Sequence, residues 1–233
     1  MCANYLPVGE SRLLRALFGV DLPAMAVKPD TYPMHDAPVI RNIIVRGEGA
    51  SEQPFRECIA ARFGLVPRWA KADTVKERRH TYNARTETVA TLASYKGPWR
   101  ERQFCLIPVE AFYEPCYESG KAVRWRISLA SGLPFALAGI WERWRHGDKV
   151  IESFSMLTVN ADEHPLMRRM HAPGEEKRMP VILRPADYDA WLNATPDEAR
   201  ALCRPYPATD MRAEPAPRPP RSGAASAPPG ESL

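Results

Sequence analysis

The sequence predicts one α+β domain, built on a curled, mostly antiparallel sheet or open barrel with peripheral helices outside it. A length of 233 residues with 45% hydrophobic side chains is enough for one domain with a buried core. Apolar, β-branched and aromatic residues fill more segments at strand spacing than at helical spacing. Most of these segments are joined by short Gly, Ser or Pro turns, which favour antiparallel pairing.

The strands are predicted from segments of apolar, β-branched and aromatic residues. They are residues 39–45, 59–66, 104–113, 123–129, 135–144, 151–159 and 178–183. Turn sequences at 130–132 and 145–148 separate consecutive segments, so those neighbours along the chain are expected to form hairpins.

Helices are predicted in fewer places. They are residues 11–18, a short piece after Ala84, and residues 161–170, 186–192 and 196–203. Thr195 is placed to cap the last of these helices, with Pro196 at its first helical position. These helices are expected to pack outside the sheet.

The chain is expected to divide into a folded domain and a tail. Residues 207–233 are dominated by Pro, Ala, Ser and Gly, which bury too little surface to offset the entropy of ordering. We therefore expect one domain over residues 1–206 and a disordered tail after it. The longest apolar run, residues 135–141, is far too short to cross a bilayer, so no membrane partner is expected. The N-terminal residues lack the pattern of a signal peptide.

Cysteines and histidines give no sign of a disulfide framework or a metal site. The five cysteines are odd in number, which favours reduced thiols and an intracellular protein. No CxxC motif is present, and His164 and His171 lack the i,i+4 spacing of a helical zinc site. We expect no metal and no cofactor.

Positive charge is concentrated in residues 41–104. This segment holds 13 Lys and Arg against 7 Asp and Glu, a net charge of +6, whereas the whole chain carries +4. Aromatic residues interrupt it at Trp69, Tyr82, Tyr95 and Trp99. Such a mixture is typical of proteins that bind single-stranded nucleic acid, and a solvated charged face over core aromatics is the alternative.

Cys2 follows the initiator methionine and is small enough for Met1 to be removed, which would leave a cysteine at the N-terminus. Its α-amine and its thiol have ordinary pKa values of about 8 and about 8.5, so both groups are nucleophiles near neutral pH. This 1,2-aminothiol condenses with an aldehyde to a Schiff base and then closes a thiazolidine ring. The alternative is that Cys2 is only a small residue left by translation.

Six motifs together resemble the SOS-response-associated peptidase (SRAP) family, whose members crosslink to abasic sites in single-stranded DNA. The resemblance covers nearly all of residues 1–205. The motifs are Met1-Cys2, residues 63–69 (FGLVPRW), 83–88 (NARTET), 105–108 (CLIP) leading to 112–114 (FYE), 157–161 (LTVNA), and His171 ahead of 178–183 (RMPVIL).

The resemblance implies four catalytic residues. Cys2 matches the family nucleophile, and Glu114 matches an acid that protonates the sugar oxygen and shuttles protons at the amine. His171 matches a histidine suited to proton transfer on the opened sugar. Asn83 is expected to orient the amine or the sugar by hydrogen bonds.

The resemblance also implies the DNA contacts. Arg85 and Arg178 would clamp phosphates, Trp69 would stack on a base beside the lesion, and Thr158 would contact the backbone. The implied partner is single-stranded DNA with an abasic site, near a junction with duplex, bound by a cytoplasmic, nucleoid-associated monomer. Peptide cleavage, as in removal of Met1 or self-release, fits the family's peptidase label.

The sequence departs from the family pattern at positions expected to touch DNA. Asn4 replaces a phosphate-binding arginine, and Phe63 replaces a tryptophan. Residues 172–177 lengthen the step from His171 to Arg178, and residues 34–38 replace the common Asn-Val-Ala-Pro stretch. We therefore expect the chemistry to follow the family more closely than the DNA affinity does.

Three other functions stay open at this point. A cysteine hydrolase would use Cys2 and His171 as nucleophile and base and would need no free α-amine. A noncovalent binding module would use the basic aromatic segment alone. In a globular core with an inert N-terminus, Cys2 would have no role.

Overall fold

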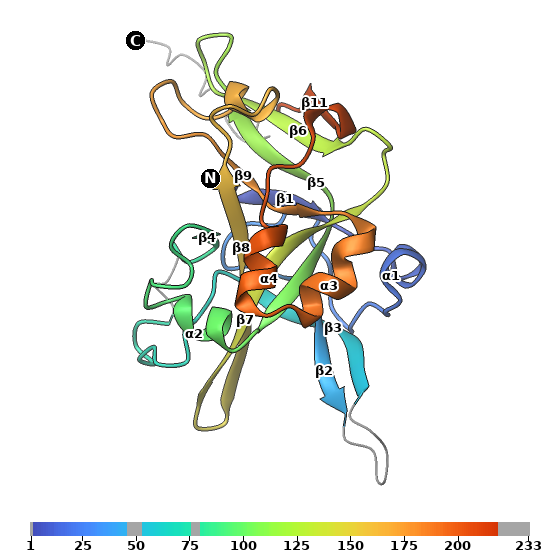
Figure 1. The fold of residues 1–233 in the computed structure, drawn as a ribbon, viewed down its shortest axis with the longest axis vertical. Helices are drawn as coiled ribbons and strands as arrows, with labels where there is room; N and C mark the ends of the chain where they lie inside the picture. The colour runs from blue at the N-terminus through green and yellow to red at the C-terminus, as the bar shows by residue number, and fades with distance from the viewer. Residues whose placement is uncertain (1, 46–52, 76–79, 219–233) are drawn as a thin grey trace, which may run out of the picture.

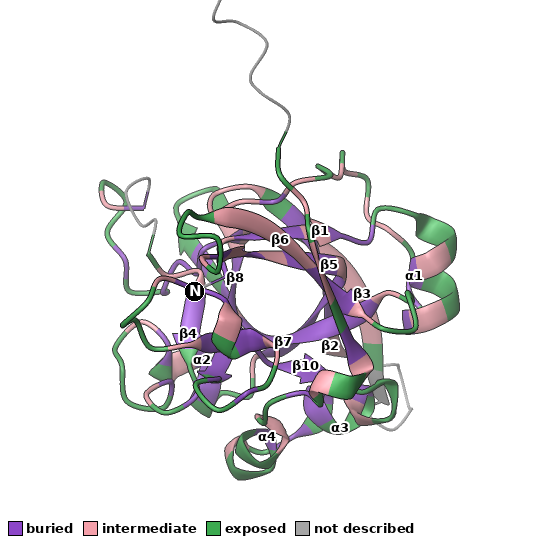
Figure 2. Ribbon diagram, turned by 90° about the horizontal axis from the view of Figure 1, so that it is seen from above, coloured by how far each residue is buried: buried purple, intermediate pink, exposed green. Residues whose placement is uncertain are grey.

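A closed barrel of five strands forms the centre of the computed structural model, which describes residues 2–45, 53–75 and 80–218 (Figure 1). The barrel strands follow one another in the order β5, β2, β3, β8 and β7, and pairing between β7 and β5 closes the ring (Figure 2). Their bounds are Asp36–Val45 (β2), Gln53–Phe63 (β3), Phe104–Cys116 (β5), Phe135–His146 (β7) and Lys149–Asn160 (β8). All barrel pairs are antiparallel except β3 with β8. The predicted fold class is confirmed.

Closure of the barrel depends on a close approach of β5 and β7. Gly139 lies opposite Cys105 in this pair, and a Cβ atom there would lie 2.9 Å from both Cys105 Sγ and Ile107 Cδ1. Only glycine fits this spacing without displacing its neighbours.

Six shorter strands extend the barrel. They are Asn4–Pro7 (β1), Asn83–Arg85 (β4), Val123–Leu129 (β6), Arg178–Pro180 (β9), Ile182–Leu183 (β10) and Met211–Pro215 (β11). β1 and β6 pair with the far half of β5, and β11 pairs with β6. β4 and β9 pair with the end of β8, and β10 pairs with β7. The ends of β5 and β8 therefore gather short strands from distant parts of the sequence.

The helices lie outside the barrel (Figure 2). They are Ser11–Phe18 (α1), Lys96–Arg100 (α2), Tyr188–Asn193 (α3) and Pro196–Leu202 (α4), with 3-10 turns at Met167–Arg169 (η1), Pro185–Asp187 (η2) and Ala208–Asp210 (η3). The predicted cap of α4 is confirmed, because Thr195 accepts a hydrogen bond from the Glu198 N–H and the Glu198 carboxylate accepts one from the Thr195 N–H. The fully buried Trp191 ties α3 to the barrel by donating to the Cys105 carbonyl at 3.0 Å.

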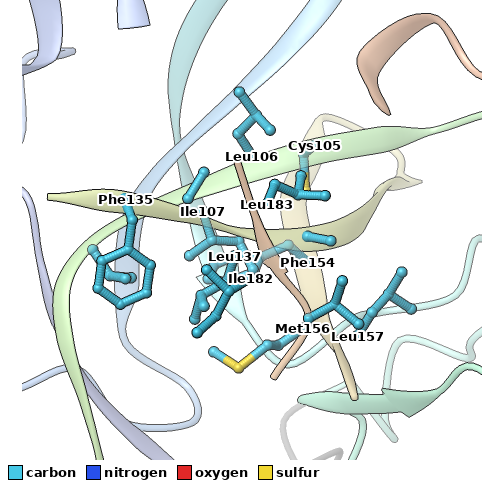
Figure 3. Close-up of a cluster of buried hydrophobic side chains, with 14 of the residues drawn as sticks. Cys105, Leu106, Ile107, Phe135, Leu137, Phe154, Met156, Leu157, Ile182 and Leu183 are labelled. Atoms are coloured by element: carbon cyan, nitrogen blue, oxygen red, sulfur yellow. The ribbon is translucent and has the colours of Figure 1, made fainter. Parts of the chain in front are cut away.

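Aliphatic and aromatic side chains from β5, β7, β8 and β10 form one cluster of the core (Figure 3). Phe154 stacks on Phe63 with 5.2 Å between ring centroids, and Phe63 also meets the edges of Tyr5 and Tyr82. This aromatic group fixes β1, β3 and the chain before β4 against β8. Phe63 is fully buried in it, so this departure from the family pattern falls in the core and not at a DNA contact.

Several predicted boundaries are wrong. The predicted strand 59–66 begins earlier, at Gln53, and ends at Phe63, because Gly64 has φ +120° and turns the chain away. The predicted strand 178–183 is two strands, since Val181 donates to the Leu157 carbonyl on β8 and accepts from the Ala138 N–H on β7.

The predicted helix 161–170 is also wrong, since only η1 is helical there. Pro165 lacks an N–H to donate, and the His164 ring accepts from the Met167 N–H at 3.0 Å in place of a helical carbonyl. The segment after Ala84 forms turns and not a helix, and α2 begins at Lys96.

The expected boundary at residue 206 is too early. The chain forms η3 and then β11, which pairs with the exposed edge of β6 from Met211 to Pro215. Pairing on an existing strand supplies backbone hydrogen bonds that the composition does not reveal. Residues 219–233 of the expected tail lie outside the described residues. Within the described ranges, no helix has the length and apolar character to cross a membrane.

Candidate active site

Cys2 lies beside the end of β5 because β1 pairs with that strand. Asn4 is opposite Tyr113, so the residues before it run alongside Glu114 and Pro115, and the Cys2 thiol interacts with the Glu114 carboxyl. Asn83 on β4 donates from Nδ2 to the Cys2 carbonyl at 2.7 Å, which fixes the start of the chain from a second direction. Cys2 is only 1% exposed.

The Cys2 thiol and the Glu114 carboxyl are buried together. Burial, with the nearby Glu114 charge, holds the pKa of the Cys2 thiol well above its usual value, and the thiol donates weakly to the Asn4 carbonyl at 3.6 Å. Glu114 is 2% exposed, and burial raises its pKa to about 7. At neutral pH the thiol is therefore protonated, while Glu114 is divided between its acid and base forms.

His171 faces the same carboxyl. Its Nδ1 lies 3.6 Å from Glu114 Oε2, and its Nε2 lies 3.0 Å from the Arg178 carbonyl oxygen. Because a carbonyl only accepts, we assign the proton to Nε2, which leaves the Nδ1 lone pair toward Glu114. Burial and the positive chain terminus lower the pKa of His171, which favours this neutral ring.

The backbone of His171 is held in an unusual conformation. Its φ is +65°, in the left-handed region of backbone conformation that few residues other than glycine adopt. The His171 N–H donates to the Pro115 carbonyl at 2.7 Å, and Lys177 Nζ donates to the His171 and Ala172 carbonyls. The lengthened 172–177 segment thus closes on His171 through Lys177, a contact that the sequence did not indicate.

Two buried oxygen atoms at this site have no hydrogen-bond partner among the described residues. They are Asn83 Oδ1 and Glu114 Oε1. An unpaired buried acceptor is costly, and each of these atoms is able to accept a hydrogen bond from a substrate hydroxyl or amine. Cys2, Asn83, Glu114 and His171 therefore converge, with both acid-base groups and unused acceptors around one thiol.

Two of the residues expected to bind DNA are internal. Arg178 is 2% exposed and donates to the Thr158 carbonyl at 2.7 Å, to Glu87 at 2.8 Å and to Glu176 at 2.6 Å. Thr158 is fully buried, and its hydroxyl accepts from Arg178 at 3.2 Å. A phosphate would reach this guanidinium only after its carboxylate contacts open.

The other two residues that were expected to bind DNA, Trp69 and Arg85, lie on the surface. Trp69 is 56% exposed, and its indole N–H donates to the Ala93 carbonyl at 3.2 Å. Arg85 is half-exposed and forms an ion pair with Glu176 at 2.7 Å. Both side chains are accessible from solvent.

The expected basic face is partly neutralised in the structure. Arg41 is buried between Glu57 and Glu152, and Arg56 and Arg68 also form ion pairs with carboxylates. Residues 46–52 and 76–79, which hold more of the counted charges, lie outside the described residues.

Asn4, which stands where the family pattern has a phosphate-binding arginine, is buried. Its Nδ2 donates to the Thr31 carbonyl and to Asp30, and its Oδ1 accepts from Arg124 at 2.9 Å. Arg124 is 120 residues away in sequence, so no local pattern predicted this contact.

No group of three or more His, Cys, Asp and Glu side chains is placed to hold a metal ion within residues 2–45, 53–75 and 80–218.

Comparison with known proteins shows to which family the chain is similar. The model of the SOS response associated peptidase (SRAP) family matches residues 1–218. "Abasic site processing protein YoqW" of Bacillus subtilis is 34% identical over 219 residues, 91% of each chain. "Abasic site processing protein HMCES" of Gallus gallus is 26% identical over 74% of this chain and 56% of that protein. A crystal structure of a Bordetella bronchiseptica protein matches with a TM-score of 0.84 and 36% identity, over 92% of this chain and 99% of that one. The chain belongs to the SRAP family.

Proposed function

We propose that this protein captures abasic sites in single-stranded DNA by forming a thiazolidine with Cys2. One observation carries the proposal: the Cys2 thiol is buried against Glu114, a carboxyl whose pKa is raised to about 7. Related proteins are named abasic site processing proteins, which supports a reaction with this lesion. The ring-opened deoxyribose supplies the aldehyde that a 1,2-aminothiol requires.

The reaction begins once Met1 is removed and the Cys2 amine is free. The amine attacks C1′ of the open sugar and forms a carbinolamine, which loses water to give a protonated Schiff base. The thiol sulfur then adds to the same carbon, and the electron pair of the C=N bond moves to nitrogen. The thiol releases one proton, so the sum is aldehyde plus aminothiol to thiazolidine plus water.

Glu114 is suited to both proton transfers. In its acid form it protonates the sugar oxygen during ring opening and the hydroxyl that leaves as water. In its ionised form it takes the proton of the thiol, which burial keeps from ionising alone. The neutral Nδ1 of His171, 3.6 Å away, is placed to exchange that proton with Glu114.

Asn83 serves as the positioning residue for the nucleophile. Its Nδ2 holds the Cys2 carbonyl at 2.7 Å, and its buried Oδ1 is able to accept from the Cys2 amine or a sugar hydroxyl. Trp69 and Arg85 supply the DNA contacts at the surface, and Arg178 with Thr158 would join them only after ion pairs open. We place the protein at the nucleoid in the cytoplasm, acting as a monomer on single strands and at junctions with duplex.

Intact-protein mass spectrometry tests the proposal. The processed protein is mixed with an oligonucleotide that carries one abasic site, beside Cys2→Ser and an N-acetylated sample. We expect an adduct equal to the two masses less one water, stable for the native N-terminus and lost in both controls. Absence of an adduct from a correctly processed protein would refute the mechanism.

The same samples separate the rival functions. A cysteine hydrolase would cleave peptide or amide substrates and would tolerate N-acetylation. A noncovalent module would bind abasic and intact strands alike, with no effect of Cys2→Ser.

A further inference from the structure

One carboxylate, that of Glu176, bridges the two arginines that were expected to clamp phosphates. Glu176 Oε1 accepts from Arg178 Nη1 at 2.6 Å, and Glu176 Oε2 forms an ion pair with Arg85 Nη1 at 2.7 Å. The hydrogen bond from Arg178 and the positive charges of both arginines hold the pKa of Glu176 below its usual value, so this carboxyl is ionised at neutral pH. Each oxygen of one anion is therefore bound by a different guanidinium.

The end of β8 brings the two arginines together. Arg85 on β4 is opposite Thr158 of β8, and Arg178 on β9 is opposite Asn160 of the same strand. Asn160 Nδ2 donates to Glu176 Oε1 at 3.4 Å. The carboxylate therefore lies at the end of β8, between side chains from the strands on either side of it.

Glu176 belongs to the segment 172–177, which lengthens the chain before β9. The segment has no regular secondary structure, and its end is fixed by backbone groups. The Ala161 N–H donates to the Lys177 carbonyl, and the Lys177 N–H donates to Asp162, both at 2.7 Å. The Glu176 side chain is 35% exposed, so it is able to turn into solvent while the backbone beside it stays in place.

Departure of Glu176 would not leave Arg178 without a counter-charge. Glu87 accepts from the same guanidinium at 2.8 Å and 3.2 Å, one distance for each carboxylate oxygen. A buried cation that loses every partner is costly, whereas one that exchanges one anion for another keeps its compensation. A second anion is therefore able to take the place of Glu176 without disturbing the buried arginine.

A DNA phosphate is an anion of the required kind. Carboxylates and phosphodiesters both offer two oxygen atoms, and guanidinium groups bind either of them through parallel hydrogen bonds. The position is also next to the reacting groups, because the Arg178 carbonyl oxygen lies 3.0 Å from His171 Nε2. A strand held at Cys2 would therefore bring its phosphates toward a guanidinium pair that Glu176 already occupies.

We propose that Glu176 occupies the place of a DNA phosphate in the free protein and thereby acts as a specificity-determining residue for capture of the lesion. A strand has to displace this carboxylate before both arginines bind it, so every strand binds more weakly than the arginines alone would allow. Intact strands then dissociate, whereas a strand with an abasic site is retained by the covalent bond. The inference rests on the proposed function and adds the role of Glu176.

The first test measures affinity without the covalent step. A labelled single strand that has no abasic site is titrated, in fluorescence anisotropy, with the wild type, Glu176→Gln and Glu175→Gln. Glu175 is the exposed neighbour of Glu176, and its substitution changes the net charge by the same amount, which makes it the matched control. We expect Glu176→Gln to bind about tenfold more tightly than the wild type, as when a competing contact fills about nine-tenths of the molecules, and Glu175→Gln to stay within about twofold of the wild type.

A double-mutant cycle tests whether Glu176 acts through the arginines. In an Arg85→Ala background the gain from Glu176→Gln should shrink, because one of the two contacts that the carboxylate blocks is absent. The proposal is overturned if Glu176→Gln binds no more tightly than the wild type, if Glu175→Gln shows the same gain, or if the gain is unchanged without Arg85.

Capture in the presence of intact strands tests the effect on specificity. An abasic strand at low concentration is mixed with each protein and with increasing amounts of the intact strand, and the rate of adduct formation is measured. The concentration of intact strand that halves this rate should be about tenfold lower for Glu176→Gln than for the wild type. Equal concentrations would overturn the role in specificity. A wild type that forms no adduct refutes the proposed function instead, and the anisotropy titrations still decide whether Glu176 competes with phosphate.

Discussion

Glu114→Gln should make the protein more stable and less active at the same time. Below pH 4.5, the usual pKa of a glutamate, the carboxyl is protonated in the folded and unfolded chains. Above it, the unfolded chain releases the proton while the folded chain keeps it until about pH 7, because burial raises the pKa. The unfolded state then binds fewer protons, so wild-type stability falls as pH rises through this window.

The size of the effect follows from the width of the window. Each tenfold difference in proton affinity corresponds to about 1.4 kcal/mol, so the interval from 4.5 to about 7 corresponds to about 3 kcal/mol. Glutamine has the same shape and never ionises. The stability of Glu114→Gln relative to wild type should therefore rise by about 3 kcal/mol between pH 4.5 and pH 8.

Denaturant unfolding of both proteins across this pH range provides the measurement. Glu118→Gln is the control, since Glu118 is exposed and its ion pair with Arg169 lowers the pKa of its carboxyl. The stability of Glu118→Gln relative to wild type should therefore not rise with pH. Crosslinking by Glu114→Gln should fall about 100- to 10,000-fold, the usual contribution of a general acid or base. If the stability difference between Glu114→Gln and the wild type does not change with pH, the raised pKa of Glu114 is refuted. If Glu114→Gln crosslinks at the wild-type rate, the role of Glu114 in proton transfer is refuted.

Three further changes have defined outcomes. Gly139→Ala places a Cβ 2.9 Å from Cys105 and Ile107, so the free energy of unfolding should fall by about 1–3 kcal/mol in denaturant titrations. Thr195→Ala removes the cap of α4 and should cost about 1 kcal/mol with no change in crosslinking rate, and a changed rate would contradict a purely structural cap. Trp69→Ala should weaken noncovalent binding of single strands by about 1–3 kcal/mol in fluorescence titrations, while the rate at saturating DNA stays that of the wild type.

Local patterning predicts β6 because its side chains alternate in polarity along the whole strand. Residues 123–129 alternate between apolar and polar side chains and form β6 with those bounds. β1 has four residues and a proline, so only its pairing with β5 makes it a strand. β11 likewise forms because it pairs with the edge of β6, and the composition of residues 207–233 does not predict that pairing.

The residues of the candidate site were predicted by resemblance, but the contacts around them were not. The motifs selected Cys2, Asn83 and Glu114, and the fold brings them together. The burial of Asn4 and Arg178 arises from partners as distant as Arg124 and Glu87, and a sequence pattern carries no information about such contacts. The assignment of Arg178 to a phosphate contact therefore took no account of the carboxylates that already hold it.

Two kinds of feature that lower the stability of the fold, unpaired buried acceptors and a strained backbone, lie around Cys2. Asn83 Oδ1 and Glu114 Oε1 are buried acceptors without partners among the described residues, and His171 has φ +65°. Such features persist where a function requires them and the surrounding structure holds them in place. Here the β1–β5 pairing, the Asn83 contact and the Pro115 carbonyl supply that support. A variant at Glu114 that gains stability and loses crosslinking would show that this buried carboxyl is required for the chemistry and lowers the stability of the fold.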